Sequence, residues 1–158
     1  MIKLFKIILS IILLAFISAC GFEGLYSLEN SSIRISKISA SGDKRIGHVI
    51  KNEISLISKK YGKRDLEISI DLTKKKEVKE KNISNNVTKY NIILYADLTI
   101  NEFEKSKVSK LKIQKSSDYA VSTSHSDTIE NEKKAVKSVT ELIAEDIVKH
   151  LILNYGRK

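Results

Sequence analysis

Four stretches of the chain alternate between apolar and polar residues, which is the period of a β-strand with one face buried. They predict strands over 33–38, 66–73, 90–100 and 109–121. The second is the most regular, because every other residue from Leu66 to Leu72 is apolar. On the third, Ile93 and Tyr95 interrupt the polar face, which indicates that something partly covers it. The fourth is rich in lysine, as suits an exposed edge strand.

Apolar residues at helical spacing predict two helices, over 44–61 and 127–155. The stripe of the first is Ile46, Val49, Ile50, Ile54, Ile57 and Tyr61; that of the second is Val136, Val139, Ile143, Ile147, Leu151 and Tyr155, widened by Ala135 and Leu142. The segment Ser41-Gly42-Asp43 is a turn and helix-start signal, and Gly62 suits a helix end. For the second helix, Asp127 and Glu130 resemble a capping box, and Gly156 ends it.

The order β-α-β-β-β-α predicts an α+β fold. Strands joined by a helix run parallel, whereas the last three strands form an antiparallel meander. Both helices need an apolar surface, and the sheet offers one apolar face. We therefore expect a two-layer sandwich, with two helices on one face of a four-stranded mixed sheet. The first strand flanks either the second or the fourth. The 74–87 and 122–126 loops then share one end, and the 103–108 loop shares the other with both termini.

The first twenty residues have the pattern of an export signal. Lys3 and Lys6 precede an apolar run, and small residues lead directly to Cys20, as in a bacterial lipobox. We expect a lipoprotein signal peptide over 1–19, lipidation at Cys20, a lipidated tether over 20–31, and one domain over 32–158. The alternative is a short membrane anchor with an incidental cysteine.

The predicted anchor also indicates where in the cell the protein is located. Because Gly21 and not Asp follows Cys20, the sorting rule for bacterial lipoproteins favours the outer membrane of a Gram-negative bacterium, on its periplasmic side. Export argues against a nucleic-acid partner. The charge excess, 28 Lys and Arg against 19 Asp and Glu, suits anionic lipid or phosphate instead.

Catalytic and metal-binding motifs are missing from the sequence. The single cysteine excludes a disulfide framework and a cysteine-based zinc site. The three histidines lack metal-ligand spacing, and no nucleophile elbow or glycine-rich phosphate loop occurs. We therefore predict a protein that is not an enzyme and needs no cofactor.

The candidate binding residues are a run of lysines in the predicted 74–87 loop. They are Lys74, Lys75, Lys76, Lys79 and Lys81. Ammonium groups bind phosphates as point charges, although a solvated charged loop explains the run equally well. The opposite end is also basic, with Lys59, Lys60, Lys63, Arg64, Lys105, Lys107 and Lys110. Charge alone therefore does not choose the functional end.

Several motifs, in order, resemble LptE, the lipopolysaccharide-assembly lipoprotein, in its alphaproteobacterial form. The mature start Cys20-Gly21-Phe22-Glu23-Gly24-Leu25-Tyr26 is similar to that family's Cys-Gly-Phe-x-Pro-Leu-Tyr, with Gly24 in place of proline. The run 45–52 resembles the opening of its first helix, 118–121 the end of its last strand, and 131–147 its last helix.

The resemblance implies a fold of two helices on four strands and a function. LptE-like proteins sit as a plug inside the LptD β-barrel, help it assemble, and bind lipopolysaccharide. By this resemblance Lys79 and Lys81 fill one basic binding position, and His125 in the 122–126 loop is the candidate for the other. Two alternatives stay open: an auxiliary lipoprotein of an ABC-type transport system, and a periplasmic lipid-binding domain.

Overall fold

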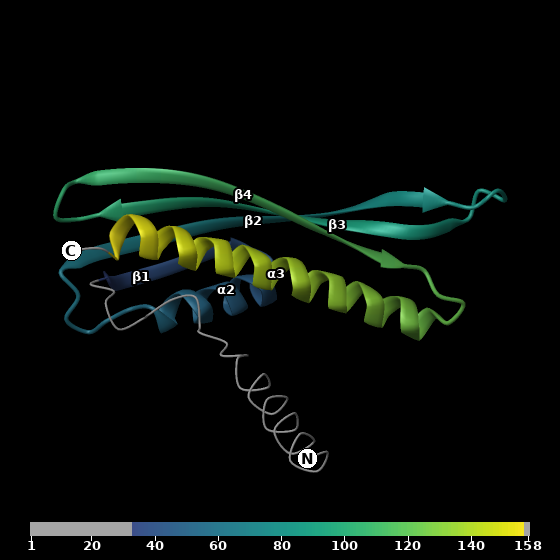
Figure 1. Ribbon diagram of the computed structural model, residues 1–158, viewed down its shortest axis with the longest axis horizontal. Coiled ribbons are helices and arrows are strands. Elements are labelled where there is room, and N and C mark those ends of the chain that lie inside the picture. The colour runs from purple at the N-terminus through teal and green to yellow at the C-terminus, as the bar shows by residue number, and fades with distance from the viewer. Residues whose placement is uncertain (1–32, 157–158) are drawn as a thin grey trace, which may run out of the picture.

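The computed structural model describes residues 33–156, which form a four-stranded sheet and two helices (Figure 1). The elements in chain order are β1 (Ile33–Gly42), α2 (Lys44–Leu56), β2 (Arg64–Lys81), β3 (Val87–Glu102), β4 (Lys107–Ala120) and α3 (His125–Tyr155). The predicted signal peptide, Cys20 and the whole of the predicted tether lie outside the described residues.

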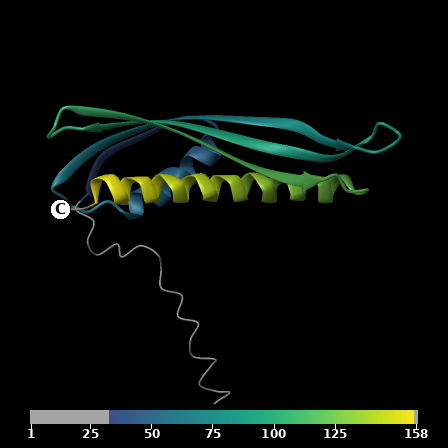
Figure 2. The same cartoon turned by 45° about the horizontal axis from the view of Figure 1, so that its top comes forward.

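The sheet has the order β1-β2-β3-β4. β1 runs parallel to β2, and the other neighbours are antiparallel. The first strand therefore flanks the second, which settles the choice that the sequence left open. Both helices lie on one side of the sheet (Figure 2), so the predicted two-layer α+β fold is confirmed.

The core lies between the sheet and the helices. The alternating apolar residues of β2 are buried from Leu66 to Leu72, and those of β3 from Ile92 to Ile100. Ile50 and Ile54 of α2 and Ile143 and Ile147 of α3 meet them, each with no exposed surface. The strand pattern was therefore read in the correct register.

The first helix is shorter than predicted. α2 begins where expected, because the Asp43 carboxylate accepts hydrogen bonds from the backbone N–H groups of Arg45 and Ile46. It ends at Leu56, so the predicted end at residue 61 is wrong, and Tyr61 is 87% exposed. The chain leaves the helix because it must pass along β1, where the Lys59 N–H donates to the Ile33 carbonyl.

The second helix begins earlier than predicted. Ser124 caps α3 by accepting a hydrogen bond from the Asp127 N–H. Asp127 is therefore inside the first turn, so the expected Asp127–Glu130 capping pair is wrong. Leu142, placed in the apolar stripe, is 41% exposed.

The β2–β3 connection differs most from expectation. The predicted 74–87 loop is mostly strand, because β2 continues to Lys81 and β3 starts at Val87. Only the short turn between them remains, held by the Asn82 side chain, which accepts from the Ser84 and Asn86 N–H groups. Backbone pairing with β3 makes this charged stretch a strand, whatever its side chains.

Candidate functional site

The two helices cover unequal lengths of the sheet. α3 has 31 residues and α2 only 13, so the hairpin half of the sheet is covered by α3 alone (Figure 1). An open groove of about 560 Å³ lies where α2 begins, between its first turn, the first half of α3, and β2. The groove is therefore a direct consequence of where α2 starts.

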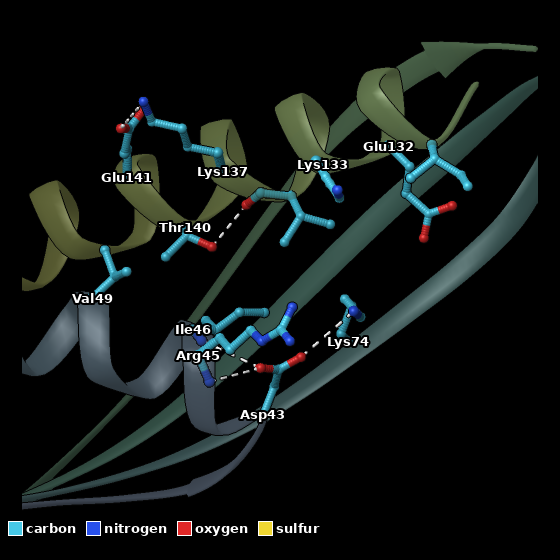
Figure 3. Close-up of a pocket in the computed structure, with 12 residues that line it drawn as sticks. Asp43, Arg45, Ile46, Val49, Lys74, Glu132, Lys133, Lys137, Thr140 and Glu141 are labelled. Carbon is cyan, nitrogen blue, oxygen red and sulfur yellow. Dashed lines mark hydrogen bonds and ion pairs between the residues drawn. The ribbon is translucent and has the colours of Figure 1, made fainter. Parts of the chain in front are cut away.

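The groove combines an apolar lining with a charged rim. Its apolar side chains come from α2 and α3: Ile46, Val49, Ile129 and Val136. Its cations are Arg45, Lys74, Lys133 and Lys137, and its carboxylates are Asp43, Glu132 and Glu141. Figure 3 shows the α2 residues on one side and the α3 residues on the other. Such a surface suits an amphiphile with apolar chains and anionic groups.

Two of the groove cations are held by carboxylates. Lys74 Nζ lies 3.5 Å from an Asp43 oxygen, and Lys137 Nζ lies 3.7 Å from Glu141. Desolvation opposes ionisation of Asp43, but the N–H bonds from Ile46 and Arg45 and the Lys74 ammonium together lower its pKa. Within residues 33–156, the Arg45 guanidinium makes no ion pair within 4.0 Å. Among residues 33–156, Arg45 is thus an unpaired cation in the lining of the groove.

Glu132 of the groove also belongs to a second cluster, which joins the hairpin to α3. Lys76 Nζ donates to Glu132 Oε2 at 2.7 Å, and Tyr119 OH donates to the same oxygen at 2.7 Å. The Lys76 ammonium also lies 4.4 Å from the ring centre of Tyr90, which stacks on Tyr119 at 5.6 Å. The cluster therefore ties β2, β3 and β4 to the start of the long helix.

The ionisation of the cluster follows from these contacts. The hydrogen bond from Lys76 lowers the pKa of Glu132, and that from Tyr119 lowers it further. The same bond raises the pKa of Lys76. Burial raises the pKa of Tyr119, so its hydroxyl stays protonated as a donor. The pair is charged throughout the neutral range.

The predicted binding lysines do not form one patch. Lys74 lines the groove and Lys76 lies in the cluster, whereas Lys75 is 5.4 Å from the Tyr95 ring centre on the opposite face of the sheet. Lys79 pairs with Asp118, and Lys81 Nζ donates to Asn85 at 3.0 Å. The lysines are thus split between both faces and the turn, and each already has a partner.

His125, predicted in a loop, is instead the first residue of α3 and is exposed. Sequence reasoning also missed Arg45, Ile129 and Lys133 as groove residues. The available signal was Ile129, an apolar residue in the first turns of the helix that the predicted apolar stripe does not include.

Two other kinds of site can be judged within residues 33–156. No group of three or more His, Cys, Asp or Glu side chains there has an arrangement that holds a metal ion. No helix in that range is long and apolar enough to cross a bilayer.

The fold is similar to that of several bacterial lipoproteins. By sequence, the chain matches neither a protein-family profile nor a curated protein. By structure, it is similar to rare lipoprotein B from Shewanella oneidensis, with 13% identity, a TM-score of 0.58, and coverage of 73% of this chain and 92% of that one. Lipoprotein B from Nitrosomonas europaea is 12% identical, with a TM-score of 0.57 and coverage of 87% of this chain and 99% of that one. A minor lipoprotein from Acinetobacter baumannii is 12% identical, with a TM-score of 0.52 and coverage of 77% of this chain and 96% of that one. At these identities the likeness establishes the fold, which this chain shares with lipoproteins.

Proposed function

We propose that this chain is a non-catalytic LptE-like lipoprotein of the outer membrane. It is anchored through Cys20, sits as a plug in an LptD-like β-barrel, helps that barrel assemble, and binds lipopolysaccharide during its insertion. The motif resemblance and the fold shared with lipoproteins B support the family, and the described residues support an amphiphilic ligand.

The groove beside α2 is the observation that supports lipopolysaccharide as the ligand. Lipopolysaccharide presents acyl chains next to phosphates. The groove offers Ile129 and Val136 next to Arg45 and Lys133. Burying an acyl chain there is favourable by about 25 cal/mol per Å² of apolar surface removed from water. Phosphates at the rim gain charge-assisted hydrogen bonds from Arg45 and Lys133.

The hairpin lysines act as a second contact region in this proposal. The lysines that have a carboxylate partner are expected to bind phosphate more weakly, because their ion pair must break first. Lys75 and Lys81 are the exceptions, since neither is paired with a carboxylate within residues 33–156. We expect these two to contribute more than Lys79, which Asp118 already holds.

The barrel partner is tested by affinity purification of the lipidated protein from detergent-solubilised membranes. A large outer-membrane barrel protein as the partner supports the proposal. Inner-membrane transporter subunits support an auxiliary lipoprotein of an ABC-type system instead. Stoichiometric lipid with neither partner supports a free-standing periplasmic lipid carrier.

Lipopolysaccharide binding by the hairpin is tested by charge removal. Changing Lys74, Lys75, Lys76, Lys79 and Lys81 to Gln is expected to weaken binding roughly tenfold or more, and in a salt-sensitive way. The matched control changes the same number of lysines at the other end of the sheet: Lys59, Lys60, Lys63, Lys107 and Lys110. Equal loss in both variants assigns the effect to net charge, and unchanged binding assigns the hairpin to solvent.

The groove has its own matched pair of variants. Ile129 lines the groove and Leu142 does not, yet both lie on α3 and both are 41% exposed. Ile129→Asp is therefore expected to weaken lipopolysaccharide binding, whereas Leu142→Asp leaves it unchanged. If the two variants bind alike, the groove is not the acyl-chain site.

A further inference from the structure

The end of the sheet opposite the hairpin has a surface that the proposed function does not use. Here β1 begins, α2 and α3 finish, and β3 turns into β4. We call it the Ile33 end. The Arg64 guanidinium donates to the Asn154 carbonyl at 3.0 Å, and the Phe103 N–H donates to the Asp65 carbonyl at 3.2 Å. These bonds bring the α2–β2 connection, the β3–β4 turn and the last turn of α3 together.

Large apolar side chains are exposed on all three of these segments. Leu56 and Tyr61 belong to the end of α2 and its connection, Phe103 to the β3–β4 turn and Val108 to the start of β4, and Leu153 to α3. Tyr61 is 87% exposed and Phe103 57%. Exposed apolar side chains that gather at one end of a domain mark an interaction surface.

The cations at the Ile33 end are mostly unpaired. In segments 56–64 and 102–110, seven Lys and Arg stand against two Glu. Glu102 is only 4% exposed and is approached by Arg64 at 3.8 Å and Lys105 at 3.5 Å. Among the described residues, the other five make no ion pair within 4.0 Å: Lys59, Lys60, Lys63, Lys107 and Lys110.

The hairpin end has a similar number of lysines but a different electrostatic state. There Lys74, Lys76, Lys79 and Lys89 each have a carboxylate within 4.0 Å. Between residues 74 and 89 only Lys75 and Lys81 have none, against five such lysines at the Ile33 end, so unpaired positive charge among the described residues is more concentrated at the Ile33 end. Lysines interleaved with Tyr, Phe and Leu suit an anionic lipid surface, where aromatic rings sit at headgroup level and ammonium groups meet phosphates.

We infer that the Ile33 end docks directly on the anionic headgroup surface of a lipid bilayer. Only 12 residues separate Cys20 from Ile33. An anchor at Cys20 therefore keeps this end within roughly 45 Å of the membrane even if the tether is fully extended. This argument from reach rests on the lipid anchor of the proposed function; the charge and the apolar side chains do not depend on it.

Docking through this end sets the orientation of the domain. The 31-residue α3 is roughly 46 Å long at 1.5 Å per residue. With the Ile33 end on headgroups, the groove and hairpin point away from the surface; this orientation applies to the domain while it is outside a barrel. The acyl anchor alone attaches the domain to the membrane but does not orient it. Docking through the Ile33 end sets the orientation.

The test uses residues 21–158, which contain the whole hydrophobic core between Ile33 and Tyr155 and lack the acyl chains. Binding is measured by flotation with phosphatidylcholine vesicles, with and without phosphatidylglycerol. The first variant changes Lys59, Lys63, Lys107 and Lys110 to Gln. The matched control changes Lys75, Lys79, Lys81 and Lys89 to Gln, so both variants have the same net charge. Circular dichroism checks that both fold.

We expect binding only with phosphatidylglycerol, a loss on the order of 100-fold in the first variant, and little change in the control. Tyr61→Ser and Phe103→Ser are expected to weaken the binding that remains at high salt. Equal loss in both lysine variants, or no vesicle binding by the unmodified chain, overturns the inference. So does capture of an acidic protein by this end without vesicle binding.

Failure here is distinguishable from failure of the proposed function. The proposed function assigns lipopolysaccharide binding to the groove and hairpin and tests the barrel partner by affinity purification, so the unmodified chain retains both if only the docking inference is wrong. Loss of both in the unmodified chain removes the proposed function and leaves vesicle binding as an independent result.

Discussion

The Lys76–Glu132 pair is predicted to fasten the charged hairpin to α3 and to contribute measurably to stability. The test is a double-mutant cycle with Lys76→Met, Glu132→Gln and the double variant. Gln at 132 keeps an acceptor for the Tyr119 hydroxyl at the same place while removing the charge. Met at 76 keeps an unbranched apolar side chain against Tyr90.

The expected magnitude follows from the exposure of the two side chains. Lys76 is 41% exposed and Glu132 33%, so solvent screens their 2.7 Å contact in part. An exposed pair contributes about 0.2–1 kcal/mol, and we expect a coupling near the upper limit, about 1 kcal/mol, because Tyr119 orients the carboxylate. Lys76→Met also loses cation–π contacts to Tyr90 and Tyr119, so it is expected to cost more than Glu132→Gln, by about 0.5–1 kcal/mol.

The assay is urea unfolding with linear extrapolation, repeated across pH. Because the pKa of Glu132 is lowered in the folded state, the pair stabilises above the ordinary Glu pKa and its contribution disappears as pH falls through the lowered value. Because the pKa of Lys76 is raised, the contribution is full below the ordinary Lys pKa and is lost as pH rises through the raised value. A coupling below about 0.3 kcal/mol at neutral pH, or one unchanged under strongly acidic conditions, refutes the reasoning.

Three further predictions concern the fold. Ile143→Ala removes a side chain with no exposed surface and is expected to lower the unfolding free energy by about 2–5 kcal/mol, whereas Leu142→Ala, at a 41% exposed neighbour, is expected to cost under about 0.5 kcal/mol; chemical denaturation measures both. Gly62→Ala would place a Cβ 2.4 Å from the Arg34 nitrogen, so it is expected to destabilise by about 1–3 kcal/mol through displacement of β1, and an unchanged melting temperature contradicts this. Burial lowers the pKa of His150, so its protonation opposes folding, and stability is expected to fall as pH drops from the ordinary His pKa towards the lowered value; His150→Gln should remove this part of the pH dependence, and an unchanged profile argues against it.

The strand faces were predictable because burial imposes a strict period. A single-residue slip would have turned Leu66 and Ile68 towards water, so the sequence determines the register wherever one face is buried. Parallel pairing of β1 with β2 followed from the intervening helix. The position of β1 in the sheet did not, because both sheet edges satisfy the same connection rule.

The element ends were less predictable, because they depend on partners distant in sequence. Nothing near Tyr61 shows that the Ile33 carbonyl will take the Lys59 N–H and end the helix early. The prediction of a loop over 74–87 was wrong for a related reason. A run of lysines is typical of a loop, yet Lys76 has an acceptor on Glu132, 56 residues away. Backbone pairing with β3, together with this contact, makes a strand from a sequence without strand character.

The same contacts change how the positive charge of this chain should be interpreted. Counting lysines makes the two ends of the sheet equivalent, and the sequence supports no choice between them. The two ends differ in ion pairing. Carboxylates from α3 and β4 pair with Lys76 and Lys79, whereas Lys59 and Lys107 are more than 4.0 Å from every carboxylate within residues 33–156. A phosphate that binds Lys76 or Lys79 must displace a carboxylate, whereas one that binds Lys59 or Lys107 displaces only water. The ends are therefore expected to differ in ligand as well as in position: an amphiphile with its own apolar chains at the groove and hairpin, and a headgroup surface at the Ile33 end.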